Sequence, residues 1–211
     1  MDLILPLAEQ YAAQFTSPED ELLARVHRET NAHPKAHMLS GHTQGAFLTF
    51  ISRLLQPKRI LEIGTFTGYS ALCLAKGLAS GGQLHTIEYR EEDADTAQRN
   101  FNLSDDRDKI ILHRGNALEI IPALKENWDL VFIDADKTGY IHYYDMLVPT
   151  MRKGAVILAD NVFFHGEVLE ESLKGKNAKA IQAFNEHVRQ DKSVEHILLT
   201  IRDGLMLILK K

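Results

Sequence analysis

Acidic and amide side chains close two apolar segments of the chain. Residues 128–133 are mostly apolar and run into Asp134, and residues 155–159 run into Asp160 and Asn161. If the two segments are neighbouring parallel strands, these three side chains meet at one edge of a sheet. Two carboxylates and an amide oxygen make a hard-oxygen site suited to Mg²⁺, with Mn²⁺ or Ca²⁺ as alternatives. The competing interpretation is that each side chain caps the helix that follows its strand.

Lys137 follows Asp134 by three residues, which places an amine beside the expected metal site. A neighbouring divalent cation and partial burial lower the pKa of a lysine and allow it to act as a general base. The alternative is an exposed lysine at a helix start, although the helix dipole disfavours a cation there. Zinc is not expected, because no cysteine lies near and the sequence has neither an H-x-H nor an HExxH pattern.

A glycine-rich turn follows a third apolar segment, residues 60–63. Gly64 and Gly68 flank this turn, and the pattern predicts a strand, a turn and the start of a helix. Ligands of open parallel sheets lie beyond the carboxyl ends of strands, and glycine lets the backbone approach them without a Cβ atom. Free N–H groups at the helix start favour a carboxylate or a phosphate. Glu88 ends the next strand and can accept hydrogen bonds from both ribose hydroxyls, so a nucleoside-type cofactor is expected.

The cofactor that these residues favour carries one nucleoside and a small charged tail. The spacing Gly64-x-x-x-Gly68 departs from the G-x-G-x-x-G fingerprint of dinucleotides, and there is no P-loop lysine. Glu62 is costly to bury unless it meets a cation, and the α-amino group of an amino-acid tail would be one. A phosphate-binding or unliganded turn stays an alternative. A serine hydrolase is disfavoured, because Gly68-Tyr69-Ser70 lacks the closing glycine of a nucleophile elbow.

Short apolar segments alternate with helical segments from residue 59 onward. Strands are expected at residues 60–63, 84–88, 109–113, 128–134 and 155–160, and helices at 69–78, 91–102, 117–125, 140–151 and 178–190. This alternation predicts a mostly parallel sheet with helices on both faces. Residues 194–201 and 205–209 flank Arg202-Asp203-Gly204 and predict a hairpin that adds an antiparallel edge last.

The first 55 residues are expected to be helical. Ser17, followed by a proline and two acids, is a helix start, and His33-Pro34 should end that helix. The length of 211 residues suits one domain. We expect a single domain over residues 1–211, divided into an N-terminal helical cap at 1–55 and a cofactor-binding sheet core at 56–211.

The composition is ordinary for a soluble globular protein, with 45% hydrophobic and 25% charged residues. Lysine plus arginine is 24 and aspartate plus glutamate is 29, and this net charge of −5 argues against binding to a nucleic-acid backbone. No apolar run is long enough to span a membrane, and residues 1–6 lack the basic start of a signal peptide. The single cysteine, Cys73, cannot form an intrachain disulfide, so a reducing, cytoplasmic location is expected.

Three segments together resemble the metal-dependent small-molecule O-methyltransferases, the group that contains the catechol and caffeoyl-CoA O-methyltransferases. They are residues 61–70, 133–137 and 159–162, and the resemblance runs from about His33 to the C-terminus. It is closer to the caffeoyl-CoA and bacterial branch than to the mammalian catechol enzyme. The resemblance implies an α/β fold of the Rossmann-like class I methyltransferase type. Its sheet would have seven mostly parallel strands with the last one antiparallel, and the closer branch suggests a homodimer.

By position, the resemblance also implies the site. The residues that match cofactor contacts are Met38, Ser40, Glu62, Gly64, Thr65, Ser70, Glu88, Ala117, Asp134 and Asp136. The metal ligands match Asp134, Asp160 and Asn161, and the catalytic residues match Lys137 and Asp134. Asp136 stands where the mammalian catechol enzyme has tryptophan, so the substrate wall differs. Residues 35–39 and 163–166 are expected to shape the substrate pocket.

The expected enzyme is an S-adenosylmethionine-dependent O-methyltransferase that acts on one hydroxyl of a vicinal diol on a small aromatic acceptor. Chelation of two adjacent hydroxyls by the metal is expected to lower the pKa of one of them, and Lys137 would remove its proton. The resulting oxygen anion would then attack the sulfonium methyl in line. An NAD(P)-dependent oxidoreductase and a non-catalytic cofactor-binding protein are the alternatives. Neither nucleic acid nor a membrane is an expected partner.

Overall fold

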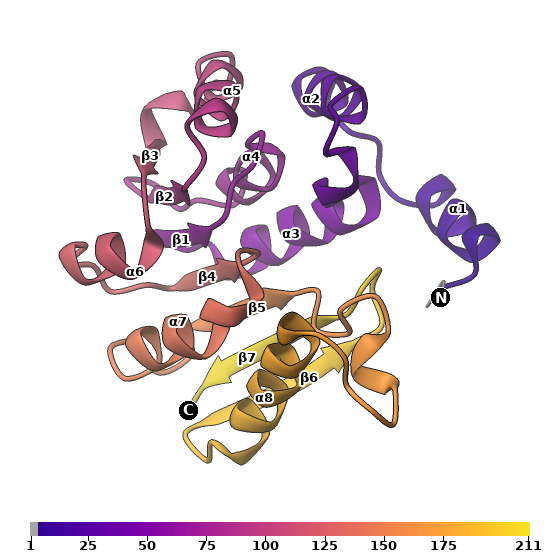
Figure 1. Cartoon of the computed structure of the whole chain (residues 1–211). Coiled ribbons are helices and arrows are strands. Elements are labelled where there is room, and N and C mark those ends of the chain that lie inside the picture. Colours follow the sequence, from indigo (N-terminus) through magenta and orange to yellow (C-terminus); the bar gives the residue numbers. More distant parts are fainter. Residues whose placement is uncertain (1–3) are drawn as a thin grey trace.

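A seven-stranded sheet organises residues 4–211, the part of the chain that the computed structural model describes (Figure 1). Its strands are β1 (Arg59–Ile63), β2 (Gln83–Glu88), β3 (Ile110–Arg114), β4 (Leu130–Ile133), β5 (Val156–Asp160), β6 (Val194–Leu199) and β7 (Leu205–Lys210). They are arranged in the order β3-β2-β1-β4-β5-β7-β6. The first five strands pair in parallel, whereas β7 is antiparallel to both of its neighbours. The predicted fold class is therefore confirmed.

Helices cover both faces of the sheet (Figure 1). The α-helices are α1 (Pro6–Gln14), α2 (Glu21–Asn31), α3 (His42–Leu55), α4 (Tyr69–Ala75), α5 (Glu91–Phe101), α6 (Ala117–Ile120), α7 (Tyr140–Leu147) and α8 (Lys176–Gln190). Single 3-10 turns are η1 (Ala36–Met38), η2 (Arg107–Lys109), η3 (Ile121–Ala123), η4 (Lys137–Gly139) and η5 (Glu167–Leu169). Helices α3, α4 and α5 lie on one face, and α6, α7 and α8 lie on the other.

Alternate side chains of the central strands pack into two hydrophobic cores, one on each face of the sheet. In β4, Leu130 and Phe132 pack into the core shared with α3–α5, while Val131 and Ile133 pack into the core shared with α6–α8. All four side chains are fully buried. Because both faces are covered, a central strand such as β4 can be apolar at every position, which explains the continuous apolar run of the sequence there.

The connection order reverses at β1, which pairs with β2 on one side and with β4 on the other. Ile63 at the end of β1 is level with Ile87 of β2 and Ile133 of β4, so the carboxyl ends of the three strands share one edge. In open α/β sheets, ligands bind outside such a reversal point. The fold therefore places the glycine turn and the acidic strand ends together.

The predicted antiparallel edge is confirmed: the β6–β7 hairpin completes the sheet beyond β5, with β7 between β5 and β6 and its Leu205, Met206 and Ile208 buried. Two local predictions need correction. Helix α2 begins at Glu21 rather than at Ser17, since the Asp20 side chain accepts the Leu23 N–H and caps it. The helix expected at 117–125 is a four-residue helix followed by a 3-10 turn.

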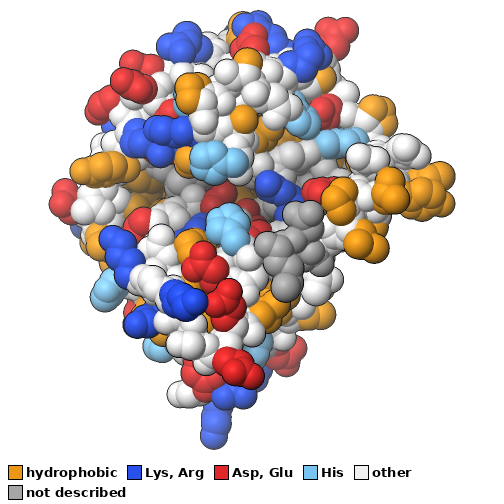
Figure 2. All heavy atoms as spheres, turned by 45° about the vertical axis from the view of Figure 1, so that its right-hand side comes forward, with side chains coloured by type: hydrophobic (Ala, Val, Ile, Leu, Met, Phe, Trp, Pro, Cys, Tyr) orange, Lys and Arg blue, Asp and Glu red, His pale blue; other side chains and the backbone are white. Residues whose placement is uncertain are grey.

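Helix α1 differs from the other helices in having no buried residue. Its Leu7 and Tyr11 side chains, together with the flanking Leu5 and Phe15, are 64–79% exposed. Figure 2 shows apolar side chains gathered on this projecting helix. Among the helices of residues 4–211, none has the length and apolar character needed to cross a membrane.

Candidate active site

A cavity of about 820 Å³ opens at the carboxyl ends of β1, β2, β4 and β5. Figure 2 shows it as a hollow in one face, with acidic side chains inside and histidines around it. The site residues expected from the sequence that line this cavity are Met38, Ser40, Gly64, Thr65, Ser70, Glu88, Ala117, Asp134, Asp136, Lys137, Asp160 and Asn161. The segments expected to shape the substrate pocket also contribute, through His37, Phe164 and His165. The fold thus brings the candidates together, with Glu62 as the exception.

Glu62 lies behind the cavity wall in β1 and is fully buried. Its Oε2 accepts a hydrogen bond from the Thr86 hydroxyl, but its Oε1 has no hydrogen-bond partner among residues 4–211. The hydroxyl of Thr65, in the adjacent turn, is likewise buried without a partner in that part of the chain. Burial raises the pKa of Glu62 to about 7 and outweighs the hydrogen bonds from nearby hydroxyls. An incompletely bonded buried carboxyl is suited to receive a cationic group.

The two glycines of the turn have a role in protein packing, and Gly64 also lines the cavity. A Cβ at Gly64 would lie 2.1 Å from the carbonyl oxygen of Asp134, and one at Gly68 would lie 2.6 Å from the Phe101 ring. Both glycines also have φ near +90°, a conformation that other residues rarely adopt. Gly64 therefore allows the turn to rest directly against the acidic end of β4.

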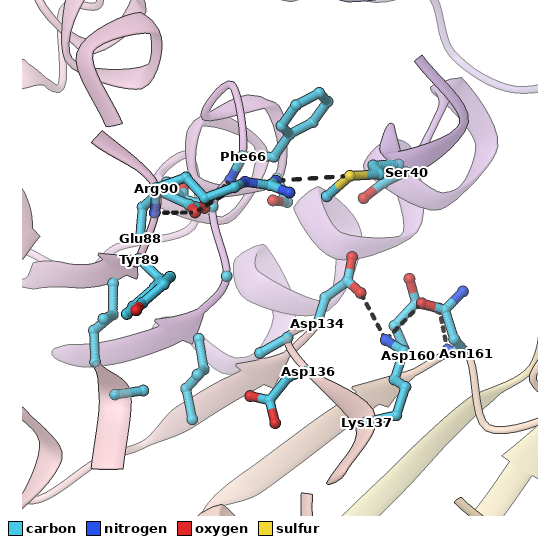
Figure 3. Close-up of a pocket in the computed structure, with 18 of the residues that line it drawn as sticks. Ser40, Phe66, Glu88, Tyr89, Arg90, Asp134, Asp136, Lys137, Asp160 and Asn161 are labelled. Carbon is cyan, nitrogen blue, oxygen red and sulfur yellow. Dashed lines mark hydrogen bonds and ion pairs between the residues drawn. The ribbon is translucent and has the colours of Figure 1, made fainter. Parts of the chain in front are cut away.

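Glu88 ends β2 with its carboxylate held in one orientation (Figure 3). Its Oε2 accepts the Phe66 N–H at 2.8 Å, and its Oε1 accepts the Arg90 N–H at 2.9 Å. The Arg90 guanidinium lies over the Phe66 ring, 5.9 Å from its centroid, and contacts the Met38 sulfur at 3.6 Å. Each carboxylate oxygen keeps a free lone pair for a further donor, such as a ribose hydroxyl.

Oxygen atoms from three side chains converge on the ammonium of Lys137, and Figure 3 shows two of these side chains, Asp134 and Asn161. Its Nζ is 3.2 Å from Asp134 Oδ1, 2.9 Å from Asn161 Oδ1 and 2.7 Å from the Tyr140 hydroxyl. Tyr140 in turn donates to the backbone carbonyl of Asp160 at 2.9 Å. The ammonium acts here as a stand-in for any cation that this oxygen set could bind.

Asp160 is buried at the end of β5, beside this oxygen set. Its Oδ2 accepts from Nε2 of Gln44 at 2.8 Å, and its Oδ1 accepts the Asn161 N–H at 2.8 Å. Burial raises the pKa of Asp160, and the negative charge of Asp134 adds to this effect. A cation held between the two carboxylates would relieve both penalties.

The donor set fits a divalent metal of the Mg²⁺ type. Carboxylate and amide oxygens are the ligands that such ions prefer. No group of three or more His, Cys, Asp or Glu side chains within residues 4–211 is placed to hold a metal. The candidate set consists instead of two carboxylates, Asp134 and Asp160, completed by the amide of Asn161. All three stand at the carboxyl ends of neighbouring strands β4 and β5.

Four residues of the site are not among those expected from the sequence: Gln44, Tyr140, Arg202 and Asp203. Gln44 gives a signal, because a glutamine on the buried side of an apolar helix needs a polar partner. Tyr140 lies three residues after Lys137, on the same side of the following turn. Arg202 and Asp203 are expected only as part of a hairpin, and nothing in their spacing connects them with the site.

Known proteins resemble this chain over nearly its whole length. The sequence profile of the O-methyltransferase family matches residues 13–211. A catechol O-methyltransferase from Niastella koreensis is 32% identical, over 99% of this chain and 98% of the relative. The crystal structure of a Bacillus cereus O-methyltransferase in complex with SAH is 31% identical, with a TM-score of 0.86 and 97% of each chain covered. The O-methyltransferase TomG from Streptomyces achromogenes, in complex with SAM, is 30% identical, with a TM-score of 0.86 over 97% and 96% of the two chains.

The match of the profile and the similarity of whole chains agree with the geometry of the cavity. They exclude the alternative of an oxidoreductase, since the profile covers both the glycine turn and the acidic strand ends. The chain therefore belongs to the O-methyltransferase family, and the enzyme class expected from the sequence is confirmed.

Proposed function

We propose that this enzyme moves a methyl group from S-adenosylmethionine to one hydroxyl of a vicinal diol on a small aromatic molecule, with the help of a divalent metal. The observation that carries the proposal is the convergence of oxygens from Asp134, Asn161 and Tyr140 on the ammonium of Lys137 at the wall of the cavity. Relatives hold SAM or SAH, and a relative is a catechol O-methyltransferase, which supports both partners of the reaction.

The methyl donor would lie against the glycine turn and the end of β2. Glu62 Oε1 would accept a hydrogen bond from its α-ammonium group, which satisfies the buried carboxyl. Glu88 would accept from the two ribose hydroxyls, because each of its oxygens has one lone pair to spare. The remaining proposed contacts line the same cavity: Met38, Ser40, Gly64, Thr65, Ser70, Ala117, Asp134 and Asp136.

Asp134, Asp160 and Asn161 would hold the metal, for which Mg²⁺ is the first choice and Mn²⁺ or Ca²⁺ suit the same ligands. When bound, a divalent ion lowers the pKa of a hydroxyl that it chelates. Lys137 lies within 3.2 Å of two of these ligand side chains, so its amine can reach the proton of an acceptor hydroxyl placed there. Lys137 is thus the proposed general base.

The aromatic acceptor would lie between the metal site and the mouth of the cavity. Phe164, His165 and Tyr143 line that part and offer flat surfaces to an aromatic ring. The Tyr143 hydroxyl donates to Asp136, which holds this wall in place. Two adjacent hydroxyls on the ring would chelate the metal, so the enzyme should require a vicinal diol.

Removal of one metal ligand tests the proposal. Asp134→Ala and Asp160→Ala should each lower kcat/KM for catechol methylation by a factor on the order of 10³, because a metal supplies several kcal/mol of stabilisation. Calorimetry should show that both variants still bind S-adenosylhomocysteine, and exposed Asp105→Ala serves as the control. Normal turnover by both variants in the presence of a chelator would remove the metal from the proposal.

We also propose that the enzyme works as a homodimer in the cytoplasm. The support for a dimer is the set of exposed apolar side chains on α1 and on α3, two helices that contact each other. The support for a reducing compartment is the single thiol, Cys73, which is buried and free.

A further inference from the structure

The turn between β6 and β7 packs directly against the metal-ligand segment. Phe163 N–H donates to the Asp203 carbonyl at 2.9 Å, and Val162 N–H donates to the Gly204 carbonyl at 3.2 Å. A Cβ at Gly204 would lie only 2.6 Å from the Phe163 ring. This turn, defined here as residues 202–204, therefore has a fixed position relative to the end of β5.

Asp203 decides how the amide of Asn161 is oriented. Its Oδ2 accepts from the Asn161 amide nitrogen at 3.2 Å, while its Oδ1 accepts the His165 N–H at 2.6 Å. A carboxylate can only accept, so it must face the NH₂ group of the amide. The amide oxygen of Asn161 then has to face the site, where it lies 2.9 Å from the Lys137 ammonium. A reversed amide would present NH₂ to a cation.

Arg202 orients the side-chain amide of Gln44. It faces the oxygen of that amide, whereas Asp203 faces the NH₂ group of Asn161. Its guanidinium donates to Gln44 Oε1 at 3.2 Å and to the Ser40 carbonyl at 2.6 Å. A guanidinium can only donate, so it must face the oxygen of the Gln44 amide. The NH₂ group of Gln44 is therefore left to donate to Asp160 Oδ2 at 2.8 Å.

We infer that Arg202 and Asp203 are positioning residues that set the amide orientations on which metal binding depends. Asp203 turns the amide oxygen of Asn161 toward the metal site. Arg202 turns the NH₂ group of Gln44 toward Asp160, which it orients. Arg202 also holds the Ser40 segment, so it connects the metal site with the cofactor wall. This inference rests on the metal-dependent function proposed above.

The affinity for a metal ion tests the inference directly, and the first variant replaces the carboxylate of Asp203 with an amide. In Asp203→Asn, the new amide has one oxygen for two donors, Asn161 and the His165 N–H, so one contact must be lost. We expect Mn²⁺ binding to the S-adenosylhomocysteine complex to weaken by about 10–100-fold, as is usual when an outer contact of a metal ligand is removed. Calorimetry and the Mn²⁺ resonance spectrum measure this change.

The exchange variant Asn161→Asp/Asp203→Asn should recover Mn²⁺ binding. Its amide at position 203 can donate to the new carboxylate and still accept the His165 N–H. In a double-mutant cycle with Asn161→Asp alone, Asp203→Asn should therefore weaken binding only when position 161 is an amide. A merely structural role would predict the same loss in both backgrounds, and that result would overturn the inference.

Two further measurements keep the outcomes distinct. Arg202→Met should weaken the binding of both Mn²⁺ and S-adenosylhomocysteine. Asp203→Asn should leave the binding of S-adenosylhomocysteine unchanged. Unaltered Mn²⁺ binding in both variants overturns the inference. Exposed Asp105→Asn is the matched control. If the unsubstituted enzyme binds no Mn²⁺, the proposed function itself fails, which is a different result from normal binding in the variants.

Discussion

The buried carboxyl of Glu62 indicates the charge of the ligand that would bind beside it. This carboxyl sits in a fully buried strand with one oxygen bonded to Thr86 and the other without a partner among residues 4–211. An uncompensated carboxyl of this kind costs stability, and burial shifts its pKa to about 7 because the neutral form is easier to bury. A cationic ligand reverses this preference, since it favours the carboxylate.

This reversal predicts that S-adenosylhomocysteine binding releases a proton. Below pH 7 the free enzyme holds Glu62 largely protonated, and a ligand ammonium lowers its pKa, so binding expels the proton. Affinity should rise with pH up to about 7 and then level off. Calorimetry in buffers of different ionisation enthalpy measures the released proton.

The variant Glu62→Gln provides the control for this prediction. It cannot titrate, so the pH dependence of affinity and the proton release below pH 7 should both disappear. Proton release that persists in Glu62→Gln would assign it to another group of the cavity.

At the scale of elements, α3 connects the packing of the N-terminal helices with the site. Its Gln44 holds Asp160, while the next residue, Gly45, lets α3 approach α4 closely. A Cβ at Gly45 would lie 2.6 Å from Cε1 of Tyr69, whose ring is buried and whose hydroxyl donates to Glu19. The crossing of α3 and α4 therefore depends on the absence of a side chain at this position.

Gly45→Ala should consequently lower stability, although alanine is the better helix former. The gain in helix propensity is about 1 kcal/mol, whereas overpacking a filled core costs about 1–3 kcal/mol. We expect the free energy of unfolding in urea to fall by about 1 kcal/mol, the middle of the ~0–2 kcal/mol of overpacking cost that propensity does not offset. An unchanged or higher value would show that α4 can move aside without cost.

At the scale of the whole molecule, α1 and α3 carry several of the large apolar side chains that are exposed. Helix α1 contacts α3, in which Phe50 and Leu54 are 63% and 66% exposed. Contiguous apolar patches of this kind usually mark an interface in soluble proteins. A second copy of the chain is the proposed occupant.

Charges placed on this surface should separate the proposed dimer. Leu7→Glu and Leu54→Glu change side chains that are 79% and 66% exposed, so they leave the core intact. Sedimentation should give about twice the chain mass of 23.8 kDa for the unsubstituted enzyme and a single chain mass for the double variant. The matched control Leu103→Glu, on an exposed side chain after α5, should remain dimeric. A monomeric unsubstituted enzyme would contradict the proposal.

The sequence by itself determined the features that depend on local patterns. Apolar runs predict β1 to β5, and parallel strands end at one edge, so the sequence places Asp134, Asp160 and Asn161 at the same edge of the sheet. The pairing of β4 with β5 in the structure makes them neighbours. Glu62 is recognisable in the same way as an acid that needs a cation, because a charged residue inside an apolar strand is costly wherever it lies.

Only the tertiary structure decided the position of β7, the contact between Gly64 and Asp134, and the roles of Gln44 and Asp203. The hydrogen bond from Gln44 to Asp160 spans 116 residues, and that from Asn161 to Asp203 spans 42. Periodicity and motif spacing describe neighbours along the chain, whereas these contacts exist because separate elements meet at the sheet edge. The sequence can therefore name the candidate ligands of the cation, but the folded chain alone shows what orients them.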